Sequence, residues 1–219
     1  MGIIWIVLWY MVAISTRKTE MGLVKKYDKD FCYFTTKLQN VMMDALSVIG
    51  TIVISESLSG RTNLISLIVL PMILSTFLFC AYTDYIDRNI YRVYSVSFII
   101  LSLVWFIMIG INSNVNLEIC LIVIGIFTLV CFILSIIKGF ALGDLFLLLG
   151  NILLILPLGF KYGGYYIEPI ALHLFFASII TLILNFKEIK KNGIKNFSNL
   201  KFSFGPGLCI ATWVVAGIL

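Results

Sequence analysis

Two aspartates in this 219-residue chain have the type and placement that could do chemistry. Asp84 closes a long apolar run, in the stretch FCAYTDYIDRNIYRVY, and Asp144 opens another, in KGFALGDLFLLLG. Two carboxyl groups that meet can share a proton, because their surroundings push the two pKa values apart. One carboxylate then takes a proton from water as a general base, while the other acts as an acid toward a carbonyl. This is the chemistry of peptide hydrolysis without a covalent intermediate.

Each aspartate also has a simpler interpretation. Asp144 follows Gly143 at the start of an apolar run, where it could cap a helix and interact with the positive end of the helix dipole. Asp84 could pair with Arg88 four residues later, in a charged turn between two helices. Asp87 has no basic residue at that spacing and is a weaker candidate for the same chemistry. The catalytic interpretation therefore requires that the fold place Asp84 and Asp144 at the same boundary.

The elements that must position these residues are membrane helices. Hydrophobic residues make up 61% of the chain, charged residues make up 12%, and the mean hydropathy is +1.06. A soluble domain usually has about 25% charged residues, and the apolar runs here are near the ~20 residues that cross a bilayer. We therefore expect an all-α, polytopic membrane bundle of about eight transmembrane helices. The expected spans are 2–15, 41–55, 63–82, 93–111, 117–137, 143–160, 166–186 and 204–219.

The distribution of positive charge predicts the orientation of these spans. The first run has no preceding basic segment and is followed by Arg17 and Lys18, so we expect a retained span with its N-terminus outside. With that start, 14 of the 16 Lys and Arg residues fall in the cytoplasmic loops, and only Arg61 and Lys161 fall outside. Cytoplasmic loops are typically rich in Lys and Arg. This orientation places Asp84 and Asp144 at the same, cytoplasmic, boundary of the cell membrane.

The other acidic residues are expected to be less informative. Asp44 interrupts the second run, where it could cap a helix or face the bundle interior; a charge inside a bilayer costs roughly 2.5 to 3.5 kcal/mol on insertion scales. Glu20 is expected to be solvated among lysines of the first cytoplasmic loop, residues 16–40. We expect the same solvated environment for Asp28, Asp30 and Glu188, and an outer location for Glu56, Glu118 and Glu168.

Three stretches resemble one known family. Asp84 is followed by Ile90, Tyr91 and Arg92, a later run opens with Ala-Leu-Gly-Asp at 141–144, and Ser-Phe-Gly-Pro at 203–206 precedes the last span. From about residue 63 onward, their order and spacing are similar to those of the type IV prepilin peptidases. These enzymes, which include preflagellin peptidases, belong to the GxGD class of membrane aspartic proteases. The chain departs from the family pattern at Tyr91, Ala141 and Phe146, where many members have proline, glycine and lysine.

The resemblance implies a function and a set of site residues. Asp84 and Asp144 would be the catalytic pair of an aspartic-type endopeptidase that needs neither cofactor nor metal. The supporting motif residues would be Gly143, Ile90, Gly205 and Pro206. Residues 63–219 would form the catalytic membrane domain, preceded by an N-terminal membrane segment, residues 1–62, with a basic cytoplasmic loop. The substrates would be pilin-like precursors, whose basic leader lies in the cytoplasm and whose apolar helix lies in the membrane.

Several alternatives stay open at this point. The aspartates could instead relay protons or bind a cation in a small transporter or channel subunit, or the chain could be a catalytically inactive relative. Transport sites more often lie near the bilayer midplane, within inverted repeats, and no repeat is visible here. The basic segment 187–201 is interpreted as an orientation anchor against membrane lipid, not as a nucleic-acid site. His173 is expected to pack inside the bundle with a hydrogen-bond partner.

Overall fold

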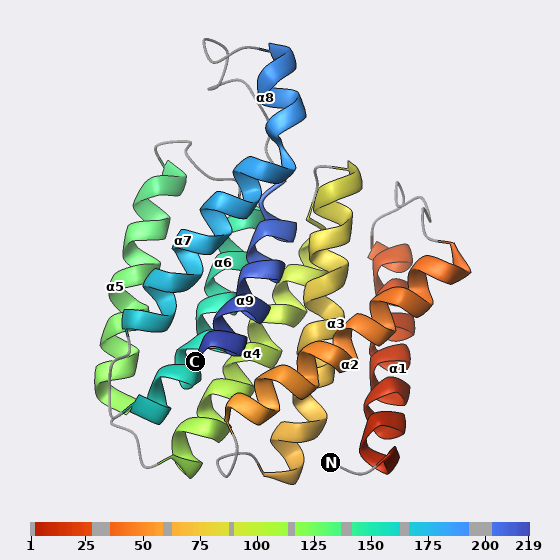
Figure 1. Cartoon of the computed structure of the whole chain (residues 1–219), viewed down its shortest axis with the longest axis vertical. Coiled ribbons are helices and arrows are strands. Elements are labelled where there is room, and N and C mark those ends of the chain that lie inside the picture. The colour runs from red at the N-terminus through yellow and green to blue at the C-terminus, as the bar shows by residue number, and fades with distance from the viewer. Residues whose placement is uncertain are drawn as a thin grey trace.

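The computed structural model shows a bundle of helices (Figure 1). It describes residues 3–27, 36–58, 63–87, 90–113, 117–136, 142–162, 167–192 and 203–219, and within these ranges it contains no strand. The elements in chain order are α1 (Ile3–Tyr27), α2 (Lys37–Ser57), α3 (Leu64–Asp87), α4 (Arg92–Asn112), α5 (Leu117–Ile136), α6 (Leu142–Ile155), the 3-10 helix η1 (Leu156–Tyr162), α7 (Ile167–Leu184), α8 (Phe186–Asn192) and α9 (Gly205–Ile218).

The all-α prediction is confirmed, and every expected span coincides with a helix. The predicted and observed bounds agree closely where the apolar run is long. Helix α4 corresponds to the span predicted at 93–111, and α6 together with η1 corresponds to the span predicted at 143–160. Five of the described helical segments are long and apolar enough to cross a membrane. They are Lys37–Ser57, Leu64–Ile86, Arg92–Asn112, Gly143–Phe160 and Ile167–Leu184.

The expected count of eight spanning helices is not reached by these criteria. Helix α9 is shorter, at Gly205–Ile218, and in the 20-residue helix α5 the apolar stretch whose side chains are all described is Glu118–Val130. Helix α1 is long, but it contains Arg17, Lys18 and Glu20 within one turn. The short length of α9 and the charge content of α1 account for two of the differences.

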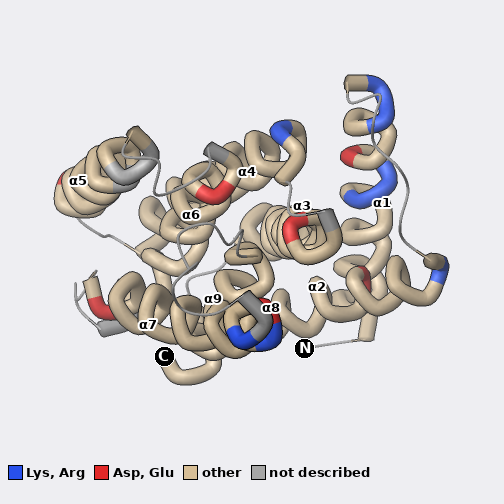
Figure 2. The backbone as a smooth tube through the Cα atoms, turned by 90° about the horizontal axis from the view of Figure 1, so that it is seen from above, with Lys and Arg blue, Asp and Glu red and all other residues tan. Residues whose placement is uncertain are grey.

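Long helices alternate in direction along the chain. Helices α1, α3, α5 and α7 run toward the top of Figure 1, and α2, α4, α6 and α9 run back. We call the top of this view the basic end, since Lys25 and Lys26 end α1, Lys37 begins α2 and Arg92 begins α4 there. Figure 2 looks down on this end and shows positive segments at these three helices and in α8.

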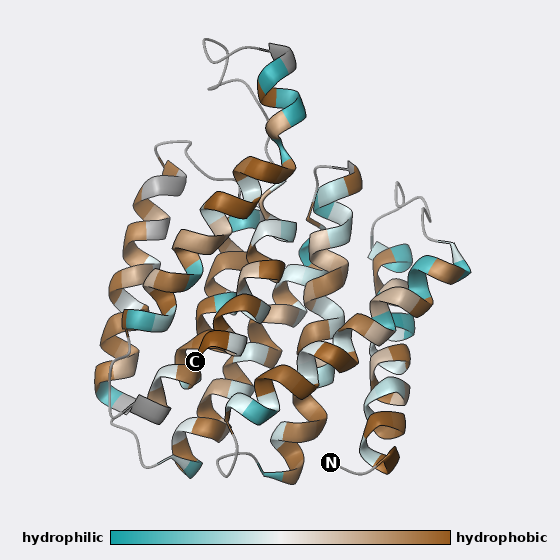
Figure 3. Cartoon of the chain, in the orientation of Figure 1, coloured by the Kyte–Doolittle hydropathy of each residue, from teal (hydrophilic) through white to brown (hydrophobic). Residues whose placement is uncertain are grey.

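Hydrophobic residues predominate along most helices of the bundle (Figure 3). Large hydrophobic side chains on its outer helices are exposed, for example Leu121 and Ile126 on α5 and Ile183 on α7, at 58%, 61% and 67%. Apolar surface on this scale is rare on a monomeric protein in water and is expected of helices that face lipid. The structure therefore supports a multi-pass membrane protein.

Helix α3 lies at the centre and contacts α1, α2, α4 and α9. Its fully buried apolar side chains form much of the core, and Phe77 stacks on Phe98 of α4 with ring centroids 4.7 Å apart. Because α3 carries Asp84 near its end, these contacts also position the first candidate residue. The N-terminal pair α1 and α2 packs on the same helix.

The loop expected at residues 16–40 was predicted too long, because α1 continues without a break to Tyr27. Arg17, counted in that loop, is instead buried and forms a bidentate pair with Asp44 of α2. Arg17 Nε is 2.8 Å from Asp44 Oδ1, and Nη2 is 2.7 Å from Oδ2. Asp44 thus faces the bundle interior, and Thr36 caps α2. Likewise, part of the predicted loop 187–201 is helical, in α8, and residues 193–202 lie outside the described ranges.

The prediction that Glu20 is solvated is wrong. Its side chain is buried against α3, with Thr76 Oγ1 2.7 Å from Glu20 Oε1. Glu20 Oε2 has no hydrogen-bond partner among the described residues. Helical spacing explains the error: Ala13, Glu20 and Val24 lie on the inward face of α1, so a continuing helix carries Glu20 into the bundle.

The buried pair Arg17–Asp44 generates a stability prediction. Arg17→Met or Asp44→Leu alone should lower the free energy of unfolding by about 3–5 kcal/mol, because each leaves a buried charge without its partner. The double variant should recover most of the loss, and Lys18→Met, at an exposed position of α1, should change little. Thermal unfolding of the detergent-solubilised chain measures all four. A double variant as unstable as the sum of the singles would contradict the pairing.

Candidate functional site

Asp84 lies three residues before the end of α3, and its side chain is only 4% exposed. Its Oδ2 atom accepts two hydrogen bonds from the segment that begins α9. The backbone N–H of Gly205 donates over 2.7 Å, and Ser203 Oγ donates over 3.0 Å. The first N–H groups of a helix have no partner within the helix, and negative charge is favoured there. The Asp84 carboxylate therefore caps a helix that follows it by about 120 residues.

Gly205 permits this contact because it has no side chain. A Cβ atom at this position would lie 3.1 Å from Asp84 Oδ2 and 3.1 Å from the Cα atom of Ala81. Pro206 follows in the first turn of α9, where its fixed φ suits a helix start and the missing N–H costs nothing. Gly205 and Pro206 thus form the helix start that receives Asp84.

Asp144 is the third residue of α6 and is half-buried. The preceding residue, Gly143, packs against Ile90, which lies just before α4: a Cβ atom on Gly143 would be 3.1 Å from Ile90 Cβ. Lower on the same two helices, Gly150 of α6 accommodates the ring of Phe98 in the same way. Close packing of α6 on α4 therefore sets the height of Asp144 at the basic end.

The structure brings the predicted site residues to one end of the bundle. Asp84 lies at the end of α3, Gly205 begins α9, and Gly143 lies at the start of α6. These three helix ends lie at the basic end (Figure 1), and Ile90, just before α4, packs against Gly143 there. The side chain of Asp87, the weaker candidate, lies outside the described residues, as does Arg88, its neighbour and the expected partner of Asp84. Asp84 and Asp144 thus lie at the same end of the bundle, and the cytoplasmic location of that end stays a prediction.

Two further residues that position the site were missed. Asn151 on α6 and Thr212 on α9 are fully buried and hydrogen-bonded, with Thr212 Oγ1 2.9 Å from Asn151 Oδ1. Each lies seven residues after a motif residue, Asp144 or Gly205, and thus two turns or about 10.5 Å deeper on the same helix face. A polar residue seven positions after each motif was the available signal.

His173 of α7 completes this network, and its predicted environment is confirmed. It is fully buried, with Nε2 2.8 Å from Asn151 Nδ2 and 3.3 Å from Thr212 Oγ1. Nε2 also lies 3.1 Å from the carbonyl oxygen of Leu208 on α9. The network therefore ties α6, α7 and α9 together beneath the aspartates, and it fixes the helix carrying Asp144 relative to the helix that Asp84 caps.

A metal centre finds no obvious ligands in this part of the chain. Among the residues that the structure describes, no three His, Cys, Asp or Glu side chains are grouped so that they could hold an ion. The carboxylates at the basic end are suited to proton transfer with water as co-reactant, provided that they face a common substrate.

Comparison with known proteins adds no relative to this description. No family model, no curated protein and no solved structure matches the chain. The functional argument therefore depends on the residues and on their arrangement.

The contact between Gly205 and Asp84 can be tested directly. Gly205→Ala should destabilise the protein by about 1–3 kcal/mol, because the added methyl group meets both the carboxylate and the backbone of α3. Gly22→Ala is the matched control, since a Cβ atom there meets nothing within 4 Å. In thermal unfolding the control should be neutral or slightly stabilising. Equal behaviour of the two variants would contradict the close approach.

Proposed function

We propose that this chain is a membrane aspartic endopeptidase that removes the basic leader peptide from type IV prepilin-like precursors at the cytoplasmic face of the cell membrane. One observation carries the proposal. Residues of three separate sequence motifs pack in pairs at one end of the bundle, Asp84 with Gly205 and Gly143 with Ile90. In both pairs, a glycine of one motif leaves the space that a residue of another motif occupies: Gly205 for Asp84, and Gly143 for Ile90. Unrelated residues at the ends of helices would not be expected to fit together in this way.

In the proposed reaction, Asp84 and Asp144 act together on one water molecule. One carboxylate removes a proton as the water oxygen attacks the scissile carbonyl, forming a C–O bond. The other carboxyl group, which is protonated, donates its proton to the carbonyl oxygen. The proton taken from water then passes to the amide nitrogen as the C–N bond breaks, and a hydroxyl proton of the tetrahedral intermediate returns to the second carboxylate. The products are a carboxyl terminus on the leader and a new amino terminus on the mature protein, and no covalent intermediate forms.

The position of the aspartates suits the substrate class. A precursor with a basic leader and an apolar helix has its junction at the boundary between cytoplasm and lipid. Asp84 ends an apolar helix and Asp144 begins one, at the end of the bundle where the described helices carry Lys25, Lys26 and Arg92. In the proposed orientation the basic end faces the cytoplasm, so the aspartates lie at the level of the junction.

Neutral substitutions test the assignment. Asp84→Asn removes the negative charge but keeps an oxygen that can accept the hydrogen bond from the Gly205 N–H. Asp144→Asn removes the negative charge at the start of α6. Each should reduce leader removal by at least about 10²-fold, since general acid–base catalysis contributes about 10²–10⁴-fold. Co-expression with a candidate precursor, followed by mass analysis of the precursor N-terminus, measures the effect.

Glu168→Gln is the matched control, because Glu168 is an exposed carboxylate in the first turn of α7, at the opposite end of the bundle. It should process the precursor as the unmodified chain does. Full processing by Asp84→Asn or Asp144→Asn, with the protein inserted at normal levels, would exclude these residues as the catalytic pair.

The buried Glu20 favours proton or cation transport as a second candidate function. Its partner Thr76 lies eight residues before Asp84 on α3, about 12 Å deeper in the bundle. A buried carboxylate at such a depth is a typical proton or cation carrier. If this alternative holds, reconstituted vesicles will take up protons or a monovalent cation, Glu20→Gln will abolish the uptake, and no precursor will be cleaved.

A further inference from the structure

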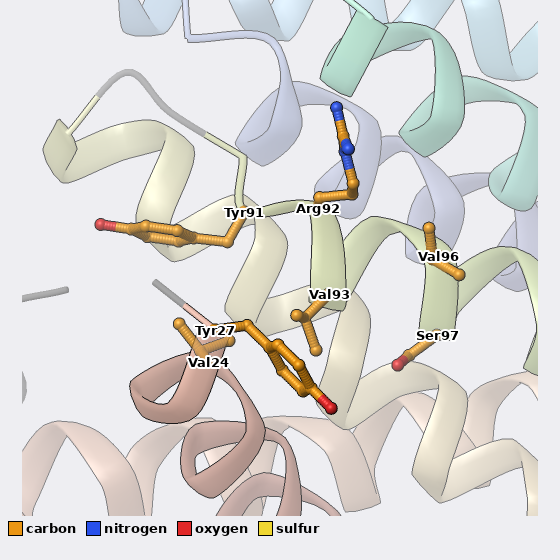
Figure 4. A pocket seen from close by; sticks show the side chains of 7 residues that line it. All are labelled: Val24, Tyr27, Tyr91, Arg92, Val93, Val96 and Ser97. Carbon is orange, nitrogen blue, oxygen red and sulfur yellow. The ribbon is translucent and has the colours of Figure 1, made fainter. Parts of the chain in front are cut away.

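A cavity of about 610 Å³ opens at the basic end between α1 and α4 (Figure 4). Helix α1 contributes two side chains from its last turn, and the others come from the first turns of α4 and the residue before it. The lining residues are Val24, Tyr27, Tyr91, Arg92, Val93, Val96 and Ser97. This volume lies within the range of roughly 300–1,000 Å³ that is typical of small-molecule sites.

The cavity has a charged rim and an apolar wall. Arg92 is the first residue of α4 and is exposed, and among the described residues no hydrogen bond or ion pair engages its guanidinium group. A second cation lies nearby, since Lys26 Nζ is 5.5 Å from the centroid of the Tyr27 ring. Among the lining residues that the structure describes, Arg92 is the only charged one and none is acidic. The rim therefore attracts an anion.

Further into the bundle along α4, the residues that line the cavity are mostly apolar. Val93 and Val96 follow Arg92 within about one turn; Val93 lies toward Tyr27 and Val24 of α1, and Val96 points to the same side of α4 as Arg92 (Figure 4). Tyrosine rings, from Tyr27 and Tyr91, lie at the transition, as is typical of residues at a membrane–water interface. A ligand that fits this lining has a negative head and an apolar tail.

We propose that this cavity binds one anionic phospholipid from the surrounding membrane. Its phosphate lies between Arg92 and Lys26, and one acyl chain follows the valine-lined wall. Charge excludes the basic leader of a precursor as the occupant, because Arg92 and Lys26 repel it. The inference does not depend on peptidase activity, since it rests on the lining residues and on Lys26 beside Tyr27.

Native mass spectrometry of the full chain in detergent tests the proposal without any precursor. Phosphatidylglycerol, phosphatidylcholine with matched acyl chains, and glycerol phosphate are titrated separately. We expect one phosphatidylglycerol molecule to bind more tightly than phosphatidylcholine, and glycerol phosphate to bind much more weakly, because it lacks the chains. Equal binding of the two lipids would overturn the proposal, and so would glycerol phosphate binding as tightly as phosphatidylglycerol.

Variants separate the two parts of the site. Arg92→Gln should weaken phosphatidylglycerol binding about fivefold, corresponding to about 1 kcal/mol for one basic residue near an anionic surface. Val96→Trp, which fills the apolar part and keeps both charges, should also lower the bound fraction. Lys187→Gln, which removes an exposed charge on α8 at the same end, is the control and should bind as the unmodified chain does. Unchanged binding by Arg92→Gln, or an equal loss in the control, would reject this cavity as the site.

Discussion

The capping of α9 by the Asp84 carboxylate is the contact on which the arrangement of the basic end depends. A helix that begins inside a bundle has N–H groups without partners, and in an apolar environment each such group is costly. Asp84 satisfies the first of them and places its negative charge at the positive end of the helix dipole. The same contact gives Asp84 its fixed position, so a structural requirement and the proposed catalytic role fall on one residue.

Small residues allow the helices to approach closely enough for such contacts. Within lipid, apolar side chains gain little by leaving the surrounding hydrocarbon, so helix association depends on close packing and hydrogen bonds. Gly207 of α9 illustrates this: a Cβ atom there would lie 3.0 Å from the carbonyl oxygen of Ala177 on α7. Gly150 against Phe98 and Gly143 against Ile90 do the same between α6 and α4. The glycines thus determine where the motif residues lie.

Buried polar groups, together with the glycines, determine how the helices are oriented against one another. The pair of Arg17 and Asp44 joins α1 to α2, the contact between Glu20 and Thr76 joins α1 to α3, and the network around His173 joins α6, α7 and α9. Each cluster links helices that an apolar interface alone would leave free to slide or rotate. Their positions away from the aspartates suggest a division between residues that orient the helices and residues at the basic end that would do chemistry.

The sequence by itself determined the helical class and the approximate position of most long helices, and it predicted that Asp84 and Asp144 lie at the same end of the bundle. These follow from the length of apolar runs and from the distribution of Lys and Arg, which are local or additive properties. Tertiary structure alone decided that Glu20 and Arg17 lie inside, that Asp84 caps α9, and that Asn151, His173 and Thr212 form one network. Each of these depends on which helix faces are in contact, and contacts between residues up to 121 positions apart leave no periodic signal in one sequence.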